Sequence, residues 1–209
     1  NKLVARLDNN PDIGMLGPIT NSAGNEQQIF TRGHTLQQKM EEGGNYACAG
    51  QSNLIRAYRM DFFCVAIPRT VIDKVGLLDE AFGRGYFEDL DYSLRVSEAG
   101  FQLAIAEDCF VFHQGSSSFK KIPLEIKLLM KKNRQLVMRK HGSLVRLQHK
   151  RWSNLSVLRQ YIDQKKSGIV VPSLCIQNRL LQAKLDTPRS PIKRWLYLFR
   201  LNQMARQLE

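Results

Sequence analysis

Several features that define common protein classes are missing from this 209-residue sequence. No stretch approaches the roughly 18 to 20 uncharged apolar residues that a membrane-spanning helix needs, and the first residues lack the apolar block of a secretory signal. No Gly-rich phosphate-binding turn follows a first strand, so we find no recognisable nucleotide-binding half. Because the first residue is not Met, we expect that something upstream has been removed.

Closely spaced cysteine pairs are also missing. A disulfide framework or a zinc site uses such pairs, whereas scattered cysteines among apolar or small neighbours are typical of buried thiols. We therefore expect free, buried thiols in a reducing compartment, which points to the cytoplasm. The four cysteines are Cys48, Cys64, Cys109 and Cys175.

Positive charge is abundant and unevenly distributed. Of the formal net charge of +12, little belongs to residues 1–149, which hold 19 Lys and Arg against 16 Asp and Glu. Residues 150–209 hold 12 against 3. This basic tail has two interpretations: helices packed on the protein with a solvated face, or a surface that contacts anionic membrane lipid peripherally. No nucleic-acid-binding module is recognisable, so no specific nucleic acid partner is expected.

Apolar patterns of the strand type alternate with patterns of the helix type, which predicts an α/β architecture. The last helix should begin at Ser190-Pro191, with Trp195, Leu198, Phe199 and Leu208 on its apolar face. The detail of residues 26–60 is not predicted. Strands are expected at 13–18, 62–67, 101–106 and 109–113, and helices before residue 9, at 71–75, 87–99 and 122–137, and in the tail, with breaks near 168–172 and 187–191.

An acidic stretch, GYFEDLDYSLR, is the most chemically informative part of the sequence. Glu88, Asp89 and Asp91 open the helix expected over 87–99, where the positive end of the helix dipole favours an ionised, proton-accepting carboxylate. His113 closes the next apolar run. These groups could activate a hydroxyl and bind a divalent metal. A solvated capping turn and a satisfied core histidine are the alternative interpretations.

The landmarks around this stretch follow an ordered pattern: G-x-L-D-E-x-F, an aromatic, E-D-x-D-x-x-x-R, a glycine before a strand, and a histidine before a Gly/Ser loop. Over residues 61–119 the pattern closely resembles the C-terminal half of the bacterial inverting glycosyltransferases of family two, which have the GT-A fold. The opening NPDIGMLGP and NSAGNEQ resemble the segment that follows the donor half. The landmarks are Gly76, Asp79, Glu80, Phe82, Glu88, Asp89, Asp91, Arg95, Gly100 and His113.

The resemblance implies a partial GT-A fold, the acceptor-side half, with a mixed sheet flanked by helices over residues 1–142. Residues 143–209 would form a basic helical extension. Asp89 matches the base that deprotonates the acceptor hydroxyl, Glu88 would orient it or bind the acceptor, and His113 would help to ligate Mn²⁺ or Mg²⁺ on the donor diphosphate. The resemblance also assigns acceptor binding to Asp91 and Arg95, and a loop that closes over the diphosphate to Gly115, Ser116 and Ser117.

The resemblance further implies a nucleotide-sugar donor and a glycan or lipid-linked acceptor, in cytoplasmic assembly of bacterial polysaccharide. The Asp-x-Asp motif that shares the metal in this family does not occur in the expected place, so the chain alone is expected to transfer little sugar. Gln148 to Trp152 fits the Q-x-x-R-W pattern of processive relatives, but a basic helix start with one core tryptophan is the preferred explanation. The alternative function is a non-catalytic basic interaction or membrane-docking module that retains a fold remnant.

Overall fold

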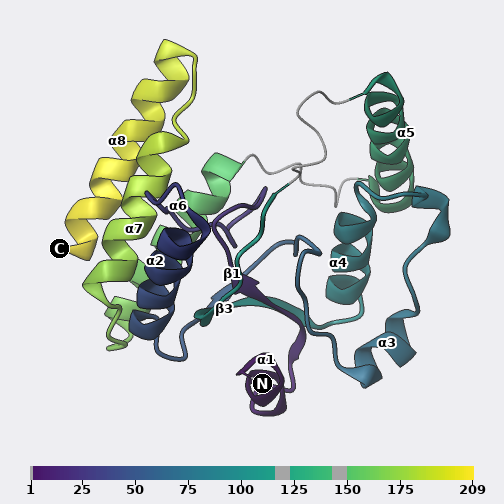
Figure 1. Cartoon of the computed structure of the whole chain (residues 1–209), viewed down its shortest axis with the longest axis horizontal. Helices are drawn as coiled ribbons and strands as arrows, with labels where there is room; N and C mark the ends of the chain where they lie inside the picture. Colours follow the sequence, from purple (N-terminus) through teal and green to yellow (C-terminus); the bar gives the residue numbers. More distant parts are fainter. Residues whose placement is uncertain (1, 116–122, 143–149) are drawn as a thin grey trace. The chain divides into compact units, whose positions relative to one another are not determined.

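The computed structural model describes residues 2–115, 123–142 and 150–209, without the side chains of residues 150–152. In these ranges the protein is a mixed α/β structure in which helices flank a three-stranded sheet (Figure 1). After the last described strand, all described elements are helices. The strands are β1 (Ile13–Ile19), β2 (Leu54–Arg56) and β3 (Gln102–Phe110); the helices are α1 (Lys2–Asp8), α2 (Leu36–Ala49), α3 (Arg69–Val75), the 3₁₀ turn η1 (Glu80–Phe82), α4 (Glu88–Glu98), α5 (Leu124–His141), α6 (Lys150–Lys166), α7 (Ser173–Leu185) and α8 (Pro191–Leu208).

The sheet has the order β1-β3-β2, and its central strand pairs differently on its two sides. The hydrogen bonds show that β3 runs parallel to β1 and antiparallel to β2. All seven residues of β1 are buried, as expected for a strand covered on both faces. The bonds are Gln102 N to Asp12 O (2.8 Å) and Val111 N to Ile19 O (3.0 Å) on the parallel side, and Ala57 N to Leu103 O (2.9 Å) and Glu107 N to Asn53 O (3.0 Å) on the antiparallel side.

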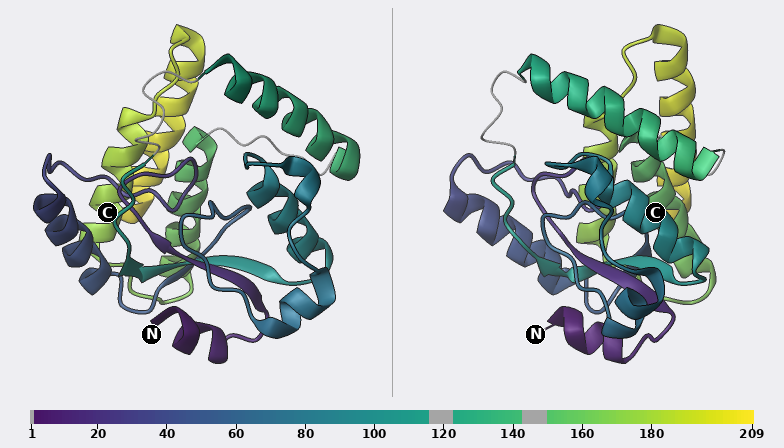
Figure 2. Two further views of the ribbon diagram at one scale, coloured as in Figure 1. Left: turned by 45° about the vertical axis from the view of Figure 1, so that its right-hand side comes forward. Right: turned by 90° about the vertical axis from the view of Figure 1, so that its right-hand side faces the viewer.

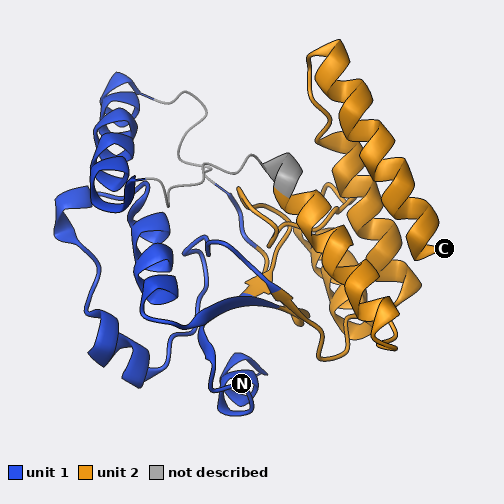
Figure 3. Cartoon of the chain, turned by 180° about the vertical axis from the view of Figure 1, so that it is seen from behind, with its two compact units in different colours: residues 1–17, 56–105, 113–147 blue, residues 18–55, 106–112, 148–209 orange. Residues whose placement is uncertain are grey.

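The chain divides into two compact units that interleave along the sequence (Figure 3). The first unit consists of residues 1–17, 56–105 and 113–147, and the second of residues 18–55, 106–112 and 148–209. Helices α6 to α8 therefore share a unit with α2 and with the end of β3. The expected division into residues 1–142 and 143–209 stays a prediction.

In the first unit, α4 lies beside α5 (Figures 1 and 2). Part of their contact is apolar, with Leu90 and Leu94 of α4, Val137 of α5 and Phe82 of η1 all buried in one cluster. Burying side chains of this size stabilises a fold by roughly 1.5 to 3 kcal/mol each. The contact therefore fixes the start of α4, where the acidic stretch lies.

In the second unit, a buried polar cluster joins β3 to three helices. Both oxygens of Glu107 accept hydrogen bonds, from Tyr46 of α2 (2.6 Å), Tyr161 of α6 (2.7 Å), Asn53 (2.8 Å) and Arg179 of α7 (2.8 Å). Arg179 and Glu107 are both completely buried, so the carboxylate and the guanidinium compensate each other. The basic tail is thus packed into its unit through α6 and α7.

Helix prediction is confirmed over most of the chain. The predicted helix over 87–99 is α4, the one over 122–137 is α5, and the tail holds three helices with breaks where Gly168 to Pro172 and Thr187 to Ser190 stand. Pro191 is the first residue of α8, as predicted, although the side chain of Ser190 makes no capping hydrogen bond. None of the described helices combines the length and apolar character that a bilayer span requires.

The strand predicted at 62–67 is wrong. This segment is irregular and half-buried, and only Ala66 pairs with a strand, through an isolated antiparallel bridge to Leu16. Its aromatic residues pack on side chains instead: Phe62 contacts Tyr92 edge-on at 6.0 Å between ring centroids. A short apolar run reports burial of side chains, and this can occur without a hydrogen-bonded ladder.

The two strands predicted at 101–106 and 109–113 are one strand, β3, which ends at Phe110. Glu107 and Asp108, which lie between the two predicted strands, are both buried within β3, and Glu107 has the partners described above. His113 accordingly lies three residues beyond the strand end.

Two burial predictions also fail. All four cysteines are free thiols as predicted, but only Cys175 is buried, and Cys48 is exposed. In α8 the buried face is formed by Tyr197, Leu201 and Leu208, so the expected face was correct only for Leu208 among the fully buried positions. Trp195 and Phe199 are exposed.

Candidate active site

The acidic stretch begins at a strained turn. Gly85, Tyr86 and Phe87 have φ angles of 126°, 68° and 73°, and non-glycine residues pay a free-energy cost in this left-handed region. Asn133 of α5, which is completely buried, holds the turn: its Nδ2 donates to the carbonyl oxygens of Phe82 (2.7 Å), Gly85 (2.9 Å) and Tyr86 (3.0 Å). The start of α4 is therefore fixed from a neighbouring helix.

Asp89 lies half-buried in the first turn of α4, where its Oδ1 accepts a hydrogen bond from the backbone N–H of Leu90 at 2.8 Å. Burial raises the pKa of Asp89 to about 6; the neighbouring guanidinium of Arg59 lowers that pKa, while the carboxylates of Asp61 and Glu88 raise it. A carboxylate whose pKa lies this close to neutrality can both accept and release a proton near pH 7. This is the property that a general base needs.

Glu88 and Asp61 complete a cluster of three carboxylates. One oxygen of Glu88, Oε2, is buried and has no hydrogen-bond partner among the described residues. Asp61 lies 3.5 Å from the guanidinium of Arg59, measured from Oδ1 to Nη2. The sequence prediction missed Arg59 and Asp61, whose only signal was a charged pair immediately before the apolar run at 62–67.

Asp91 lies two residues after Asp89 but in a different environment. Its side chain is completely buried, and its oxygens contact Arg95 Nε (2.9 Å), Lys140 Nζ (2.6 Å) and His141 Nε2 (2.9 Å). Burial opposes ionisation, but hydrogen bonds from these three side chains lower the pKa of Asp91. Lys140 also contacts Asp79 at 2.7 Å. This ion cluster ties α4 to α5 and to the segment before η1.

Arg95 is used in the same cluster. Beyond Asp91, its guanidinium donates to the carbonyl oxygens of Val75 (3.0 Å) and Leu77 (2.9 Å) at the end of α3. The polar atoms of Asp91 and Arg95 bond to other groups of the protein, so these two residues hold the helices around Asp89 in place. Acceptor binding by these two residues stays a prediction.

His113 belongs to the first unit, where its ring stacks on Phe63 with 5.0 Å between centroids and 12° between planes. In the part of the chain that is described, no three His, Cys, Asp or Glu side chains are placed to bind one metal ion. The described residues therefore do not by themselves make a three-ligand metal site, and metal binding by His113 stays a prediction. Gly115 is described and has a φ of 74°, whereas Ser116 and Ser117 lie outside the described residues.

The structure therefore places the charges of Arg59, Asp61 and Glu88 near Asp89, while the catalytic roles of Glu88 and Asp89 stay predictions. The side chain of Trp152 lies outside the described part, so the Q-x-x-R-W interpretation stays a prediction.

Comparison with known proteins adds no further assignment. No protein-family model matches the chain. No curated protein matches it in a sequence search. The functional interpretation therefore depends on the geometry of the carboxylate cluster and on the motif resemblance.

Proposed function

We propose that this chain is the acceptor-side part of an inverting glycosyltransferase in which Asp89 is the general base. One observation supports this most directly: a half-buried carboxylate with a pKa raised to about 6 lies in the first turn of α4, beside two further carboxylates. Such a shifted carboxylate is costly to a fold and useful to proton transfer. The order of landmarks around it is that of the resembling family.

In the proposed reaction, an acceptor hydroxyl binds against Asp89. Because Oδ1 already accepts the N–H of Leu90, Oδ2 takes the hydroxyl proton. The acceptor oxygen then forms a bond to the anomeric carbon of the donor sugar while the bond from that carbon to the nucleotide diphosphate breaks on the opposite face, which inverts the configuration. The nucleotide diphosphate departs with the electron pair of the broken bond, and no covalent enzyme intermediate is needed.

The other members of the cluster have supporting roles in this proposal. The Oε2 atom of Glu88, buried and without a hydrogen-bond partner among the described residues, accepts a hydrogen bond from a second acceptor hydroxyl when the acceptor binds. Arg59 limits the rise in the pKa of Asp89, so that a useful fraction of the base is ionised near neutrality. A divalent metal, when bound, supplies charge neutralisation on the leaving diphosphate, but His113 alone does not make its site, and no step here depends on it.

The proposal is tested in the full-length protein with Asp89→Asn, a change that keeps the shape of the side chain and removes its basicity. We expect a loss of roughly 10²- to 10⁴-fold in turnover, as for other general bases, measured as release of nucleotide diphosphate from a panel of nucleotide sugars. The matched control is Asp73→Asn, since Asp73 is an exposed carboxylate of α3 that pairs with Arg69 in the same helix. Unchanged turnover in Asp89→Asn would reject Asp89 as the base.

A second measurement addresses the proton directly. In the unmodified enzyme, kcat/KM should rise with pH through about 6, the pKa of Asp89 in the folded protein. The alternative function, a non-catalytic basic interaction module, predicts no turnover with any donor and indifference to Asp89→Asn. A profile that is flat between about pH 5 and 7 would contradict the assignment of the base.

A further inference from the structure

Helix α8 is apolar on two different faces. The face formed by Tyr197, Leu201 and Leu208 is buried, as in any helix packed on a protein core. The other face is exposed and has the i, i+3, i+4, i+7 spacing of one continuous stripe. This α8 apolar stripe consists of Ile192, Trp195, Leu196 and Phe199, which are 74, 64, 48 and 51% exposed.

The stripe is ordered as well as exposed. The rings of Trp195 and Phe199 stack on each other, with 5.8 Å between centroids and 18° between planes. Exposed apolar residues that occur singly need no explanation, but a contiguous group with two stacked aromatic rings marks a surface that binds something. Tryptophan in particular is enriched where an apolar layer meets a polar one.

The charge around the stripe indicates what binds there. Residues 187–208 contain five Lys and Arg and no Asp or Glu. In α8 itself the cations are Lys193, Arg194, Arg200 and Arg206, and all four are exposed. An isologous dimer through this face would bring the same cations of two copies together, which is unfavourable. Charge complementarity therefore favours an anionic surface over a second copy of the chain.

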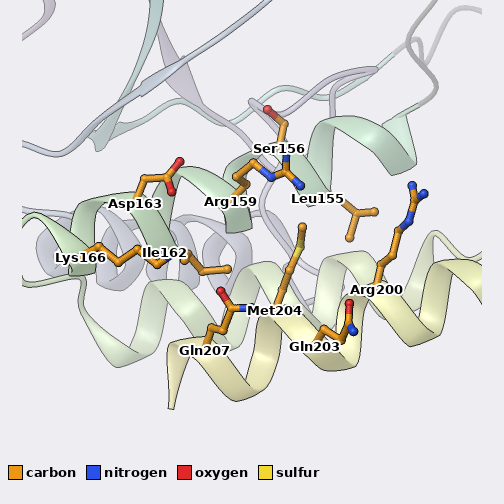
Figure 4. A pocket seen from close by; sticks show the side chains of 10 residues that line it. All are labelled: Leu155, Ser156, Arg159, Ile162, Asp163, Lys166, Arg200, Gln203, Met204 and Gln207. Atoms are coloured by element: carbon orange, nitrogen blue, oxygen red, sulfur yellow. The ribbon is translucent and has the colours of Figure 1, made fainter.

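A groove beside the stripe is also lined by more cations than acids, which favours an anionic ligand. It lies between α6 and α8 in the second unit, has a volume of about 850 Å³, and takes Arg200, the residue after Phe199, into its wall (Figure 4). Three cations, Arg159, Lys166 and Arg200, line it against one acid, Asp163. The amides of Gln203 and Gln207 add neutral hydrogen-bonding groups. This lining suits a phosphate-bearing lipid headgroup.

We propose that the α8 apolar stripe docks on an anionic membrane surface, with Ile192, Trp195, Leu196 and Phe199 in the headgroup–acyl boundary and the groove between α6 and α8 around a lipid headgroup. The helix would lie in the plane of the interface, as amphipathic helices with a cationic border do. This inference does not depend on the proposed transferase activity.

The test is binding of the chain to vesicles of phosphatidylcholine with and without phosphatidylserine. Wild type should bind only the anionic vesicles, and added salt should weaken the binding, because about fivefold in affinity is expected per cation near the surface. Ile192→Ser/Leu196→Ser should lower the partition coefficient by roughly tenfold or more, from the apolar area that no longer leaves water. The matched control is Leu124→Ser/Leu128→Ser on α5, an equally exposed i, i+4 pair, which should bind like wild type.

A local probe separates docking from loose charge attraction. In a Trp152→Phe background Trp195 is the only tryptophan, so its fluorescence should shift to the blue and be quenched by lipids brominated on the acyl chain. Arg200→Gln should weaken binding to anionic vesicles by about fivefold. Equal binding of the stripe variant and wild type, or a Trp195 emission that vesicles leave unchanged, would overturn the proposal. So would a concentration-dependent dimer that the stripe variant abolishes while vesicles remain unbound.

Discussion

Asp89 and Asp91, two residues apart in α4, should respond to neutralisation with opposite signs. Burial raises the pKa of Asp89 to about 6 from an ordinary value of 3.8. A carboxyl with a raised pKa in the folded state favours folding below about pH 4, and this contribution is lost as pH rises through 6. At neutral and higher pH Asp89 is ionised, and its burial lowers the free energy of unfolding. Asp89→Asn should remove this loss of stability.

The size of the gain follows from the shift. A change of one pKa unit corresponds to about 1.4 kcal/mol, so the rise from 3.8 to about 6 gives an upper limit near 3 kcal/mol. Because the side chain is half-buried rather than sealed, we expect a gain of about 1 to 3 kcal/mol in unfolding free energy at about pH 8. Near pH 4, where Asp89 is protonated in the folded chain, the gain should vanish.

Asp91→Asn should act in the other direction. The lowered pKa of Asp91 means that its ionised form stabilises the fold above about pH 4, and its removal leaves Lys140 and His141 without their shared carboxylate. Breaking a buried ion cluster in this way costs about 3 to 5 kcal/mol. The penalty should be full at neutral pH and shrink as the pH falls through the pKa of Asp91 in the folded protein.

The assay is urea unfolding followed by circular dichroism at about pH 4 and about pH 8, with Asp73→Asn as the exposed control. The refuting result is specific: if Asp89→Asn is less stable than wild type at about pH 8, then Asp89 is held by favourable contacts and the desolvation argument is wrong. A gain of equal size at both pH values would also exclude the titration of Asp89 as its cause.

Three further predictions concern residues that support the fold and the site. Arg179→Met should lower the unfolding free energy by about 3 to 5 kcal/mol, because it leaves Glu107 buried without its cation; calorimetry should show a melting temperature lower by roughly 6 to 20 °C. Lys184→Met, on the exposed side of the same helix, should change the unfolding free energy by less than about 0.5 kcal/mol. Asn133→Ala should cost about 2 to 3 kcal/mol in unfolding free energy, because three carbonyl oxygens lose their donor. Under the proposed function the same change should also lower kcat more than it raises KM, which a purely structural role would not predict.

Much of the helical structure was predictable because its signals are local. The apolar spacing in α4 and α5 and the Gly and Pro residues that separate the tail helices act within a few residues of one another. The strand at 62–67 and the break at residues 107–108 were wrong for the opposite reason. Glu107 is buried within a strand with partners far along the chain, among them Arg179, 72 residues further on, and single-sequence patterns do not carry such pairings.

The same limit applies to the site. The positions of Glu88 and Asp89 at a helix start were predictable from sequence, whereas their role in acid–base chemistry stays a prediction. The buried ion cluster around Asp91 was not predictable from sequence, since it depends on Lys140 and His141 at the C-terminal end of α5. The face of α8 was mispredicted because Trp195 and Phe199, the largest apolar residues of that helix, are outside and Tyr197 is inside. The size and hydrophobicity of side chains identify the buried face of a helix only when the helix has a single apolar face, and α8 has two.

The strongest reason to interpret the acidic turn as a site is that stability alone would not favour it. Tyr86 and Phe87 occupy left-handed backbone conformations, which cost about 1 to 3 kcal/mol each. Phe87 offers no side-chain cap to α4, where Ser, Thr, Asp or Asn would contribute about 1 kcal/mol. The side chain of Asn133 holds this conformation in place, and Asp89 is partly buried, which raises its pKa. Several destabilising features thus occur at one turn, and a neighbouring helix holds that turn in place. Such a combination is expected where the position of a reactive group matters more than the stability of the fold.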